Sequence, residues 1–566
     1  MASLTHKMIK GHKYYYARVC KRVNGKPKIV ETHYLGTVDK MIANTKQSKD
    51  IPQAKEVCIQ EFGATAALYD IASHLQLVEI IDRHAPKRKQ GPSVGQYMLI
   101  AAINRASHPT SKAAIAEWFE NTIGPRLFGV KPSELTSQAF WNHMEALQQD
   151  NLIKIENDLL ARLTAEFNID LNCLLYDGTN FHTYINTKTK GELAQRGHNK
   201  QKRNDLRQVS LGMMTTRDFH IPLLHMVYGG NITDPTQFGS VIDELVHRYK
   251  HLTENCPHIT LVFDKGNNSK LNFESFPKTN MHFVGSLKLT QCKALIKIPL
   301  RKYHVLQDPR LEKVKVYRTK HTVFGQERTV LITYNENLLA GQLQGIGKNL
   351  AKCKTELHSL QTRLQRWATG KTRKGKKPTI EGAKKNVTKI LQREHMKTIF
   401  KTDVFLKNDF IKLQYRVDQN ALGRLIRTVL GKTILFTDNH DWTDEQIILA
   451  YRSQYHIEHA FRDMKNPHFL GWNPRFHWTD QKIRVHAFYC VTALTLVSLL
   501  KKQLASKGIY LSVDKLMSNL NSIRETISVY PQPKGKSPHL SYSISRLSKT
   551  QKTLYETLHL NRFQQS

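Results

Sequence analysis

The spacing of apolar and polar positions divides the N-terminal third of the chain into three parts. Residues 12–36 alternate aromatic and cationic side chains around Asn24-Gly25, a pair typical of a β-hairpin turn. A polar stretch over residues 41–55 has the composition of a linker. Residues 62–165 carry apolar positions at helical spacing, interrupted by Ser, Thr and Pro. The pattern therefore predicts a hairpin, a linker and an all-helical domain.

From about residue 170 the period of the pattern changes from helical to extended. Five short apolar runs predict strands over residues 173–176, 209–215, 221–227, 259–263 and 282–287. One helix, over residues 235–249, is predicted between the third and fourth strands, and a short helix between the fourth and fifth. Three strands, a helix, a fourth strand, a helix and a fifth strand is the order of an RNase H-like core. The predicted fold class is therefore α/β and multidomain, with a mixed five-stranded core.

A long excursion follows the fifth strand. Residues 313–334 and 402–438 have the alternation of strands, and residues 336–400 between them are helical and very basic. A capping pattern at Thr443 to Gln446 then begins a helix that leads towards Glu458. The predicted domains are an N-terminal hairpin and linker (1–55), a helical DNA-binding domain (56–168), a first part of the core (169–300), an insertion (301–440), a second part of the core with Glu458 (441–505) and a helical C-terminal region (506–566).

Two aspartates stand directly after apolar strand runs. Asp177 follows the first predicted strand and Asp264 the fourth. Because these strands are neighbours in an RNase H-like core, we expect the two carboxylates to lie close together. Plotted as one helix, residues 451–465 place six side chains along one face: Tyr451, Gln454, Glu458, Phe461, Arg462 and Lys465.

Two aspartates and one helical glutamate are the carboxylates that a two-metal phosphoryl-transfer site requires. Mg²⁺ prefers such hard oxygen ligands and keeps several waters. Arg462 and Lys465 are placed to contact DNA phosphates, and Tyr451 can do so through its hydroxyl. Taken singly, an Asp after a strand is commonly a turn former, and a Glu with Arg and Lys at helical spacing is commonly a solvated helix face. The combination of two strand-end aspartates and a helical glutamate favours a metal-dependent phosphoryl-transfer site.

Charge supports a nucleic-acid partner. The chain has 85 Lys and Arg against 47 Asp and Glu, a net charge of +38, and an excess of this size in a globular protein favours a polyanion. Seven scattered cysteines without CxxC spacing indicate a reducing compartment. The N-terminus lacks an apolar signal segment, and the apolar stretch 487–500 is typical of a buried helix. We expect a soluble intracellular protein.

The same residues resemble a family. They are similar to DDE transposases of bacterial insertion sequences, in the branch with a Y-x2-R-x3-E-x6-K signature and a β-containing insertion before the final Glu. The signature maps onto Tyr451, Gln454, Glu458 and Lys465, with Gln454 where the usual Arg stands; Arg452 or Arg462 is a candidate for the missing charge. Three further segments resemble the family: Asp264-Lys265-Gly266-Asn267, Gly197-His198 through Gly212, and Tyr228-Gly229-Gly230-Asn231 to Asp234, together with Asn104-Arg105 to Lys112 in the helical domain.

The resemblance implies a transposase that binds the terminal inverted repeats of its element, nicks their 3′ ends and joins them to target DNA. It implies Asp177, Asp264 and Glu458 as catalytic residues and ligands of two Mg²⁺ ions, with Mn²⁺ as a substitute, and a homodimer that works in the cytoplasm at the nucleoid. Where excision passes through a hairpin, an aromatic residue of the insertion holds a flipped base. The candidates are Trp367, Tyr317, Phe324 and Tyr334, and packing of the insertion is the alternative role for each.

The remaining DNA contacts that we predict are basic. The run 371–377 is nearly free of acids and is either a solvated loop or a phosphate clamp; its cations are Lys371, Arg373, Lys374, Lys376 and Lys377. The full set of predicted DNA-binding residues adds Tyr451, Arg452, Gln454, Arg462, Lys465 and Trp367. Two other functions stay open: a catalytically silent DNA-binding protein derived from a transposase, and a metal-dependent nuclease of RNase H-like fold that does not transpose.

Overall fold

The computed structural model describes most of the chain, and it divides into two compact units. The described residues are 2–23, 26–47, 53–88, 90–186, 188–197, 199, 203–232, 239–240, 244, 258–268, 273, 281–371, 377–472, 477, 479–531 and 537–565. One unit contains residues 1–63 and 522–566, and the other contains residues 64–521. The predicted helix over residues 235–249, the short helix after the fourth strand and the Asn24-Gly25 turn lie almost wholly outside the described residues.

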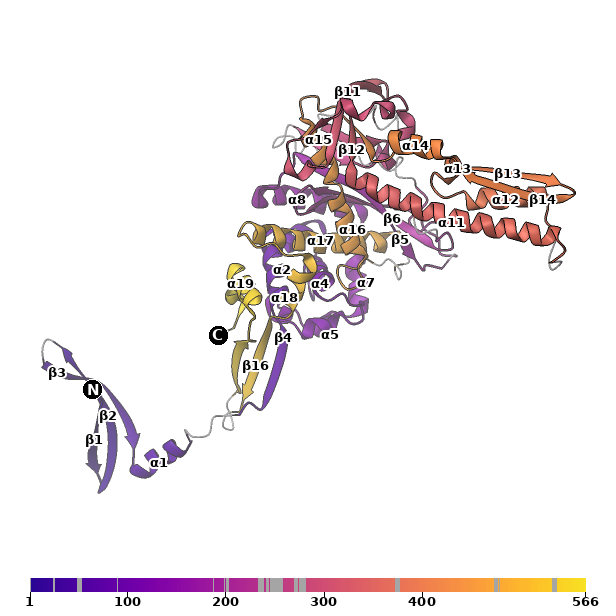
Figure 1. The fold of residues 1–566 in the computed structure, drawn as a ribbon. Coiled ribbons are helices and arrows are strands. Elements are labelled where there is room, and N and C mark those ends of the chain that lie inside the picture. The colour runs from indigo at the N-terminus through magenta and orange to yellow at the C-terminus, as the bar shows by residue number, and fades with distance from the viewer. Residues whose placement is uncertain are drawn as a thin grey trace. The chain divides into compact units, whose positions relative to one another are not determined.

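The N-terminal hairpin is part of a three-stranded antiparallel sheet (Figure 1). The two predicted strands are β2 (His12–Val23) and β3 (Lys26–Gly36), and β1 (Ala2–Ile9) pairs with the other side of β2. The predicted linker is wrong over its first part, because α1 (Val38–Gln47) is helical there.

The two ends of the chain meet in a second small sheet of the same unit. Strand β4 (Glu56–Glu61) pairs antiparallel with β16 (Arg524–Tyr530), and β16 pairs with β17 (His539–Ile544). Helix α19 (Lys549–Thr557) and a 3₁₀ turn (Leu560–Phe563) follow. The prediction of a helical C-terminal region is therefore wrong in part, and the helical domain does not include residues 56–61.

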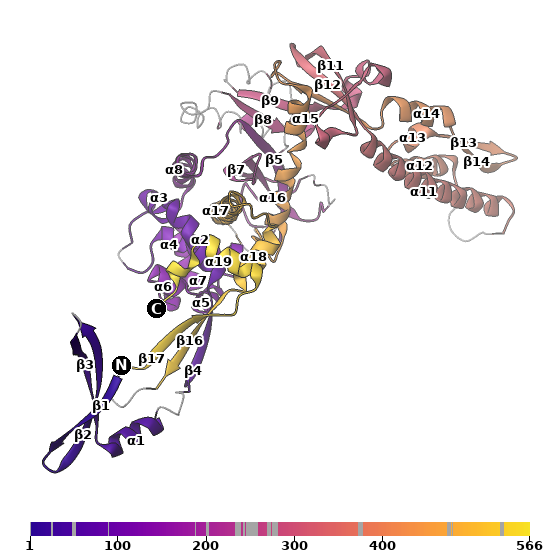
Figure 2. The same cartoon turned by 60° about the vertical axis from the view of Figure 1, so that its left-hand side comes forward.

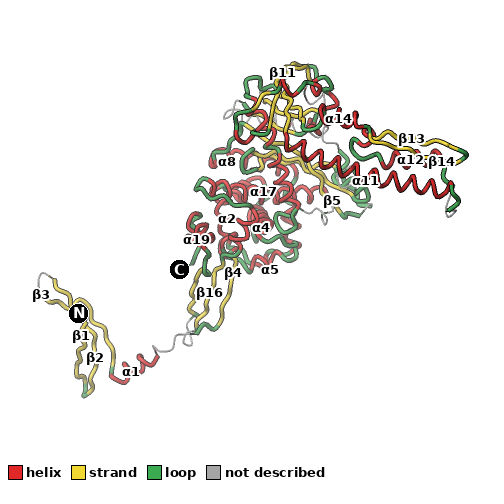
Figure 3. Tube along the Cα trace, viewed as in Figure 1, coloured by secondary structure: helices red, strands yellow, loops and turns green. Residues whose placement is uncertain are grey.

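The other unit begins with the predicted helices. Their bounds are α2 Gly63–His74, α3 Leu77–His84, α4 Val94–Ser107, α5 Ile115–Glu120, α6 Gly124–Phe128, α7 Ser137–Glu145 and α8 Gln149–Phe167, with a 3₁₀ turn at Pro132–Glu134. They pack with α17 (Asp480–Ala505), which contacts α4, α7 and α8, and α18 (Val513–Asn521) packs on α4. Figure 3 shows these helices as a red group. By length and composition α17 is the one described helix able to cross a membrane, but 89% of its apolar window is buried inside the protein.

A mixed sheet of nine described strands forms the centre of this unit, in the order β10-β11-β12-β15-β9-β8-β5-β6-β7. All five predicted strands are present: β5 Cys173–Thr183, β6 Arg207–Thr216, β7 Pro222–Gly229, β8 Ile259–Phe263 and β9 Met281–Leu287. Strands β5, β6 and β7 are antiparallel neighbours, whereas β5, β8 and β9 run parallel. Buried side chains such as Leu174, Leu261 and Phe283 form the core between the sheet and its covering elements.

The predicted insertion divides into two parts. Four of its strands extend the central sheet, so the five-stranded prediction is too small: β10 His304–Val305, β11 Val314–Val323, β12 Gln326–Asn335 and, at the end of the insertion, β15 Lys432–Thr437. Short 3₁₀ turns at Leu289–Gln291, Leu295–Lys297 and Leu300–Lys302 connect β9 to β10, and another at Pro309–Leu311 lies between β10 and β11.

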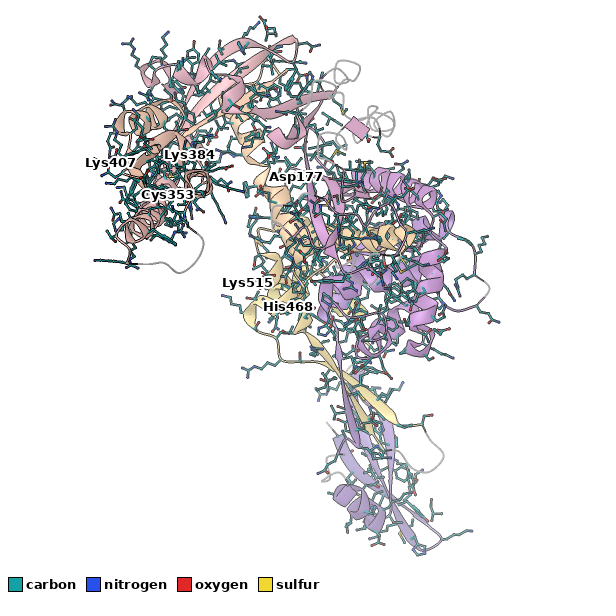
Figure 4. All side chains as sticks on the ribbon, turned by 90° about the vertical axis from the view of Figure 1, so that its right-hand side faces the viewer. Asp177, Cys353, Lys384, Lys407, His468 and Lys515 are labelled. Atoms are coloured by element: carbon teal, nitrogen blue, oxygen red, sulfur yellow. The ribbon has the colours of Figure 1, made fainter. Side chains whose placement is uncertain are left out.

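The second part of the insertion is an arm with its own core (Figure 2). It consists of α11 Glu336–Ala368, α12 Ile380–Ile390, α13 Met396–Ile399, β13 Phe400–Lys407, β14 Phe410–Val417 and α14 Gln419–Thr428. In Figure 4 Cys353 lies within this arm; its side chain is buried, whereas those of Lys384 and Lys407 are exposed.

The segment 451–465 is not one helix. Helix α15 (Asp444–Arg452) begins with a capping box between Thr443 and Gln446, as predicted, and ends at Arg452. Helix α16 (Tyr455–Lys465) starts three residues later with Gln454 at its N-cap position. Tyr451 therefore belongs to a different helix from Glu458, Arg462 and Lys465.

Candidate active site

Asp177 and Asp264 lie beside each other on neighbouring interior strands of the central sheet, at the point where β8 ends. Strands β5 and β8 are parallel and paired in register, Tyr176 opposite Phe263, and each aspartate is the next residue. Neighbouring strands are about 4.8 Å apart, so the two backbones at these positions are close. Oδ1 of Asp177 accepts a hydrogen bond from the Gly178 amide at 2.8 Å, and Oδ1 of Asp264 accepts one from the Lys265 amide at 2.7 Å. The predicted pair is therefore brought together.

The side chain of Tyr451 reaches the same place from α15. Its hydroxyl lies 2.8 Å from Ser286 Oγ and is placed to donate to Asp264 Oδ1 at 3.4 Å. Burial raises the pKa of Tyr451 to about 12, and the negative charges of Asp264 and Glu458 act in the same direction. The hydroxyl that the sequence analysis assigned to a DNA phosphate thus contacts a carboxylate and holds it in place.

Glu458 lies in the first turn of α16, and its side chain is exposed. Its charge acts on the Tyr451 hydroxyl, which in turn contacts Asp264, so the third acid faces the same region. Among the described residues, however, no three His, Cys, Asp or Glu side chains are gathered closely enough to hold a metal ion. The structure therefore brings the two aspartates together, but among the described residues Glu458 is not close enough to them to complete a three-residue metal site.

Lys465 reaches the sheet two residues beyond Asp177. Its ammonium donates a hydrogen bond to Thr179 Oγ1 and lies 5.2 Å from the centre of the Phe181 ring. Asp177, Thr179 and Phe181 share one face of β5, because alternate residues of a strand point the same way. Helix α16 is held against β5 by its buried face, which includes Phe461 and Met464. Figure 4 shows Asp177 next to this pale orange helix.

Arg452 and Arg462, the two candidates for the missing arginine charge of the signature, lie in different places. Nη1 of Arg452 is 3.4 Å from the carbonyl of Arg310, and both side chains line a cavity with Cys173 at the start of β5. Asp177 is four residues further along that strand, which is about 13 Å. Arg452 therefore points away from the acids, while Arg462 is exposed on α16 with Glu458 one turn before it.

Comparison with known proteins identifies this region. The family model described as the transposase DDE domain matches residues 170–496. The chain belongs to this family. The match contains Asp177, Asp264 and Glu458, and it extends through the arm to α17.

Two further comparisons add little to the family match. No curated protein matches the sequence. Among solved structures, a cryo-EM structure of a piggyBac transposase synaptic complex with hairpin DNA is similar at 9% identity and a TM-score of 0.37, covering 81% of this chain and 79% of that chain. At that score the likeness carries no argument about the site.

Of the other predicted DNA contacts, the structure describes Trp367, Lys371 and Lys377, which lie on the arm. Trp367 is partly buried near the end of α11, which at 1.5 Å per residue is about 50 Å long. Lys371 and Lys377 are exposed, and Arg373, Lys374 and Lys376 lie outside the described residues.

Three of the four aromatic residues proposed to hold a flipped base are part of the sheet's core. Tyr317, Phe324 and Tyr334 pack against it, and Phe324 stacks on Phe273 at 4.6 Å. Packing therefore accounts for these three, and Trp367 is the candidate that remains.

Two glycines of the family-like segments meet where backbones are in close contact. A Cβ on Gly197 would be 2.0 Å from the carbonyl oxygen of Gly230, and a Cβ on Gly230 would be 2.1 Å from that of Gln208. The Gln208 amide also donates to Gly230 O at 2.7 Å. No side chain fits at either position, so the close packing of the backbones requires glycine at both.

Sequence reasoning missed Ser286 and Thr179, the two hydroxyls that receive Tyr451 and Lys465. Thr179 is two residues after Asp177, a spacing that places both on one face, so the sequence carried a signal for it. Ser286 is in β9, next to β8, and its role depends on the pairing of distant strands, which no local pattern shows.

Proposed function

We propose that this protein is a transposase of a bacterial insertion sequence, which binds the terminal inverted repeats of its element, cleaves the DNA at the 3′ ends and transfers them to target DNA. The family match supports transposition as the activity. The observation that carries the site is the pairing of Asp177 and Asp264 in register on parallel strands, with Tyr451 of α15 contacting Asp264 and Lys465 of α16 contacting Thr179, two residues after Asp177.

We further propose that the core is RNase H-like. The order β9-β8-β5-β6-β7, with β5, β6 and β7 antiparallel and β5, β8 and β9 parallel, supports this assignment. In that fold the first acid lies on the first strand and the second directly after the fourth, as Asp177 and Asp264 do here.

The residues present fit two Mg²⁺ ions in their chemistry. Asp177 and Asp264 offer hard carboxylate oxygens side by side, and Glu458 would supply the third carboxylate. Bound there, the ions would activate the attacking oxygen and stabilise the leaving oxygen of an in-line displacement. Because the described residues contain no closed three-ligand cluster, we infer that Glu458 joins the aspartates when metal and DNA are bound.

The protein's own groups position the reacting DNA strand. The Tyr451 hydroxyl holds the Asp264 carboxylate, and Ser286 fixes that hydroxyl in turn. The Lys465 ammonium, next to Thr179, is placed to bind a phosphate beside Asp177. The net charge of +38 supplies the sequence-independent part of the affinity for DNA. Two element ends have to be brought together, so we propose a homodimer acting at the nucleoid in the cytoplasm.

A plasmid assay distinguishes the three candidate functions. The plasmid carries a selectable marker between the DNA segments that flank the gene, and the protein is supplied in trans. A transposase excises the marker and inserts it elsewhere; a nuclease without transposition leaves breaks and no insertions. A catalytically silent protein binds the flanking DNA and produces neither, even with saturating Mn²⁺. Insertions that persist in an Asp177→Asn, Asp264→Asn double variant would contradict the site.

A further inference from the structure

A second cavity lies next to the candidate active site, between the helical domain and the sheet. It has a volume of about 660 Å³, and residues of α4, α7, β5, α16 and α17 contribute to its walls. The side chains that matter here are Arg105, Lys112, Trp141, Lys465, His477 and His486. The elements that carry them are in mutual contact, as α4, α7 and α17 pack together and α16 packs on β5.

The lining of this cavity is strongly cationic. It contains Arg105, Lys112 and Lys465, and no Asp or Glu is among the described residues that line it. Burial, together with the neighbouring Arg105 and Lys482, lowers the pKa of Lys112 to about 8. Lys482 is paired with Glu145, but no described carboxylate pairs with Arg105 or Lys112. The carboxylates of the described residues therefore leave the positive charge here uncompensated.

Buried histidines at the floor of the cavity also lack partners. The Nδ1 of His477 and both ring nitrogens of His486 are buried without a hydrogen-bond partner among the described residues, and each side chain is 2% exposed. The rings are 4.3 Å apart, and Nζ of Lys112 lies 3.4 Å from His477 Nε2. Buried polar groups are normally satisfied, so among the described residues these nitrogens are open to a polar ligand.

The family-like segment 104–112 builds the wall that carries Lys112. The Asn104 side chain donates to the His108 carbonyl at 2.9 Å and accepts from the Thr110 amide at 3.2 Å. Arg105 donates to the Thr110 carbonyl at 3.0 Å. These bonds fix the loop so that Nζ of Lys112 is 4.4 Å from the centre of the Trp141 ring. The lysine is thus held in place by the chain before any ligand arrives.

We propose that this cavity is a phosphate-binding subsite for the DNA strand that leaves the active site, with Lys112 and Arg105 as its principal contacts. The inference rests on the proposed function. Lys465 lines the cavity and also contacts Thr179, two residues from Asp177, so the cavity and the aspartate pair share one wall. Asn180 and His182 of β5 line it too. Along the strand they are about 10 to 17 Å from Asp177, the length of a few nucleotides.

The test is the salt dependence of DNA binding by the full chain. A fluorescent 40-base-pair duplex is titrated with wild type, Lys112→Ala, Lys112→Arg and the control Lys131→Ala, which removes an exposed lysine of the helical domain outside the cavity. Each phosphate contact contributes about −0.9 to the slope of log K against log salt. We expect Lys112→Ala to lose about 0.9 of slope and about three- to tenfold in affinity at low salt, and Lys112→Arg to retain most of both.

Thermal unfolding of each variant establishes that the fold is kept; if Lys112→Ala does not fold, Lys112→Gln takes its place in the comparison. The subsite would be overturned if the slope of log K against log salt for Lys112→Ala equals that of wild type. It would also be overturned if Lys112→Ala reduces the slope no more than Lys131→Ala does. A wild type that binds the duplex but never cleaves element ends would contradict the proposed function and leave the subsite standing. A wild type that does not bind DNA would contradict both.

Discussion

At the residue scale, the candidate site depends on short polar contacts between elements that are far apart in the sequence. The Tyr451 hydroxyl contacts Ser286, 165 residues away, and Asp264. Lys465 contacts Thr179, which follows Asp177 by two positions. These contacts place one tyrosine and one lysine of the signature at the aspartate pair, whereas Gln454 is the signature position that departs from the family pattern.

Replacing Tyr451 with Phe tests its positioning role. The variant loses the hydroxyl that holds Asp264, and a hydrogen bond of this kind contributes about 1 kcal/mol, or about a fivefold change in rate. We expect kcat for end cleavage to fall about fivefold while the Kd for DNA is unchanged. Tyr455→Phe is the matched control, because Tyr455 is exposed on α16. A Kd that rises as much as kcat falls would show that Tyr451 contacts the DNA instead.

His220 and His456 give the fold a pH dependence. Their rings stack at 4.6 Å, and burial lowers the pKa of His220 from 6.5 to about 3, with the neighbouring His456 and Lys501 acting in the same direction. The unfolded chain takes up this proton near pH 6.5 and the folded chain does not, so stability falls as the pH drops below about 6.5. At pH 5 the loss is at most about 2 kcal/mol.

Thermal unfolding between pH 5 and 8 measures this effect. We expect the decrease in Tm on acidification to be smaller in His220→Gln than in wild type, and unchanged in His358→Gln, an exposed histidine of α11. Parallel curves for wild type and His220→Gln would contradict the assignment.

At the scale of elements, the break between α15 and α16 could not be predicted from the spacing of apolar residues. The apolar spacing continues through residues 451–465, so the sequence predicts one helix, but Ser453 and Gln454 separate two. The break lets Tyr451 face β8 and β9 while Lys465 faces β5. Core strands such as β5 and β8 were predictable because their apolar runs are continuous. Strand β4 was not, because four of its six side chains are exposed and its partner β16 is more than 450 residues away.

Helix α16 carries two exposed cations, of which one contacts the sheet, and this allows a matched comparison. Lys465 contacts Thr179 and Phe181, whereas Arg462, one turn earlier, makes no such contact among the described residues. We expect Lys465→Gln to reduce end cleavage by about tenfold or more, since it removes the charge beside Asp177, and Arg462→Gln to reduce it by less than about threefold. Cleavage rates at a fixed saturating DNA concentration decide this. Equal losses in both variants would mean that α16 acts only through its overall charge.

At the scale of the whole molecule, the first and last segments of the chain form one unit. Strand β16 pairs with β4 through six residues, and the Phe62 and Gly63 amides both donate to the Ile523 carbonyl. The central unit, residues 64–521, contains the aspartates, α16 and the arm. Strand β4 therefore depends on the C-terminal end of the sequence, and the three candidate acids belong entirely to the other unit.

Deleting residues 522–566 tests this division. Without β16, strand β4 loses its backbone partners, and we expect trypsin to digest residues 1–63 rapidly while a fragment close to 64–521 is protected. Mass spectrometry of timed digests identifies the fragments, and the intact chain is the control. Equal protection of residues 53–63 in both chains would show that β4 is held without β16.

The central claim is that Asp177, Asp264 and Glu458 act together in metal-dependent cleavage at the ends of the element. The most direct measurement is nicking of a supercoiled plasmid that carries the DNA flanking the gene, with Mg²⁺, with Mn²⁺ and with EDTA, for wild type and for Asp177→Asn, Asp264→Asn and Glu458→Gln. We predict metal-dependent nicks at the element ends for wild type, a loss of at least about a thousandfold in each variant, and retained DNA binding. Nicking at wild-type rate by any of the three variants, or by wild type in EDTA, would contradict the account.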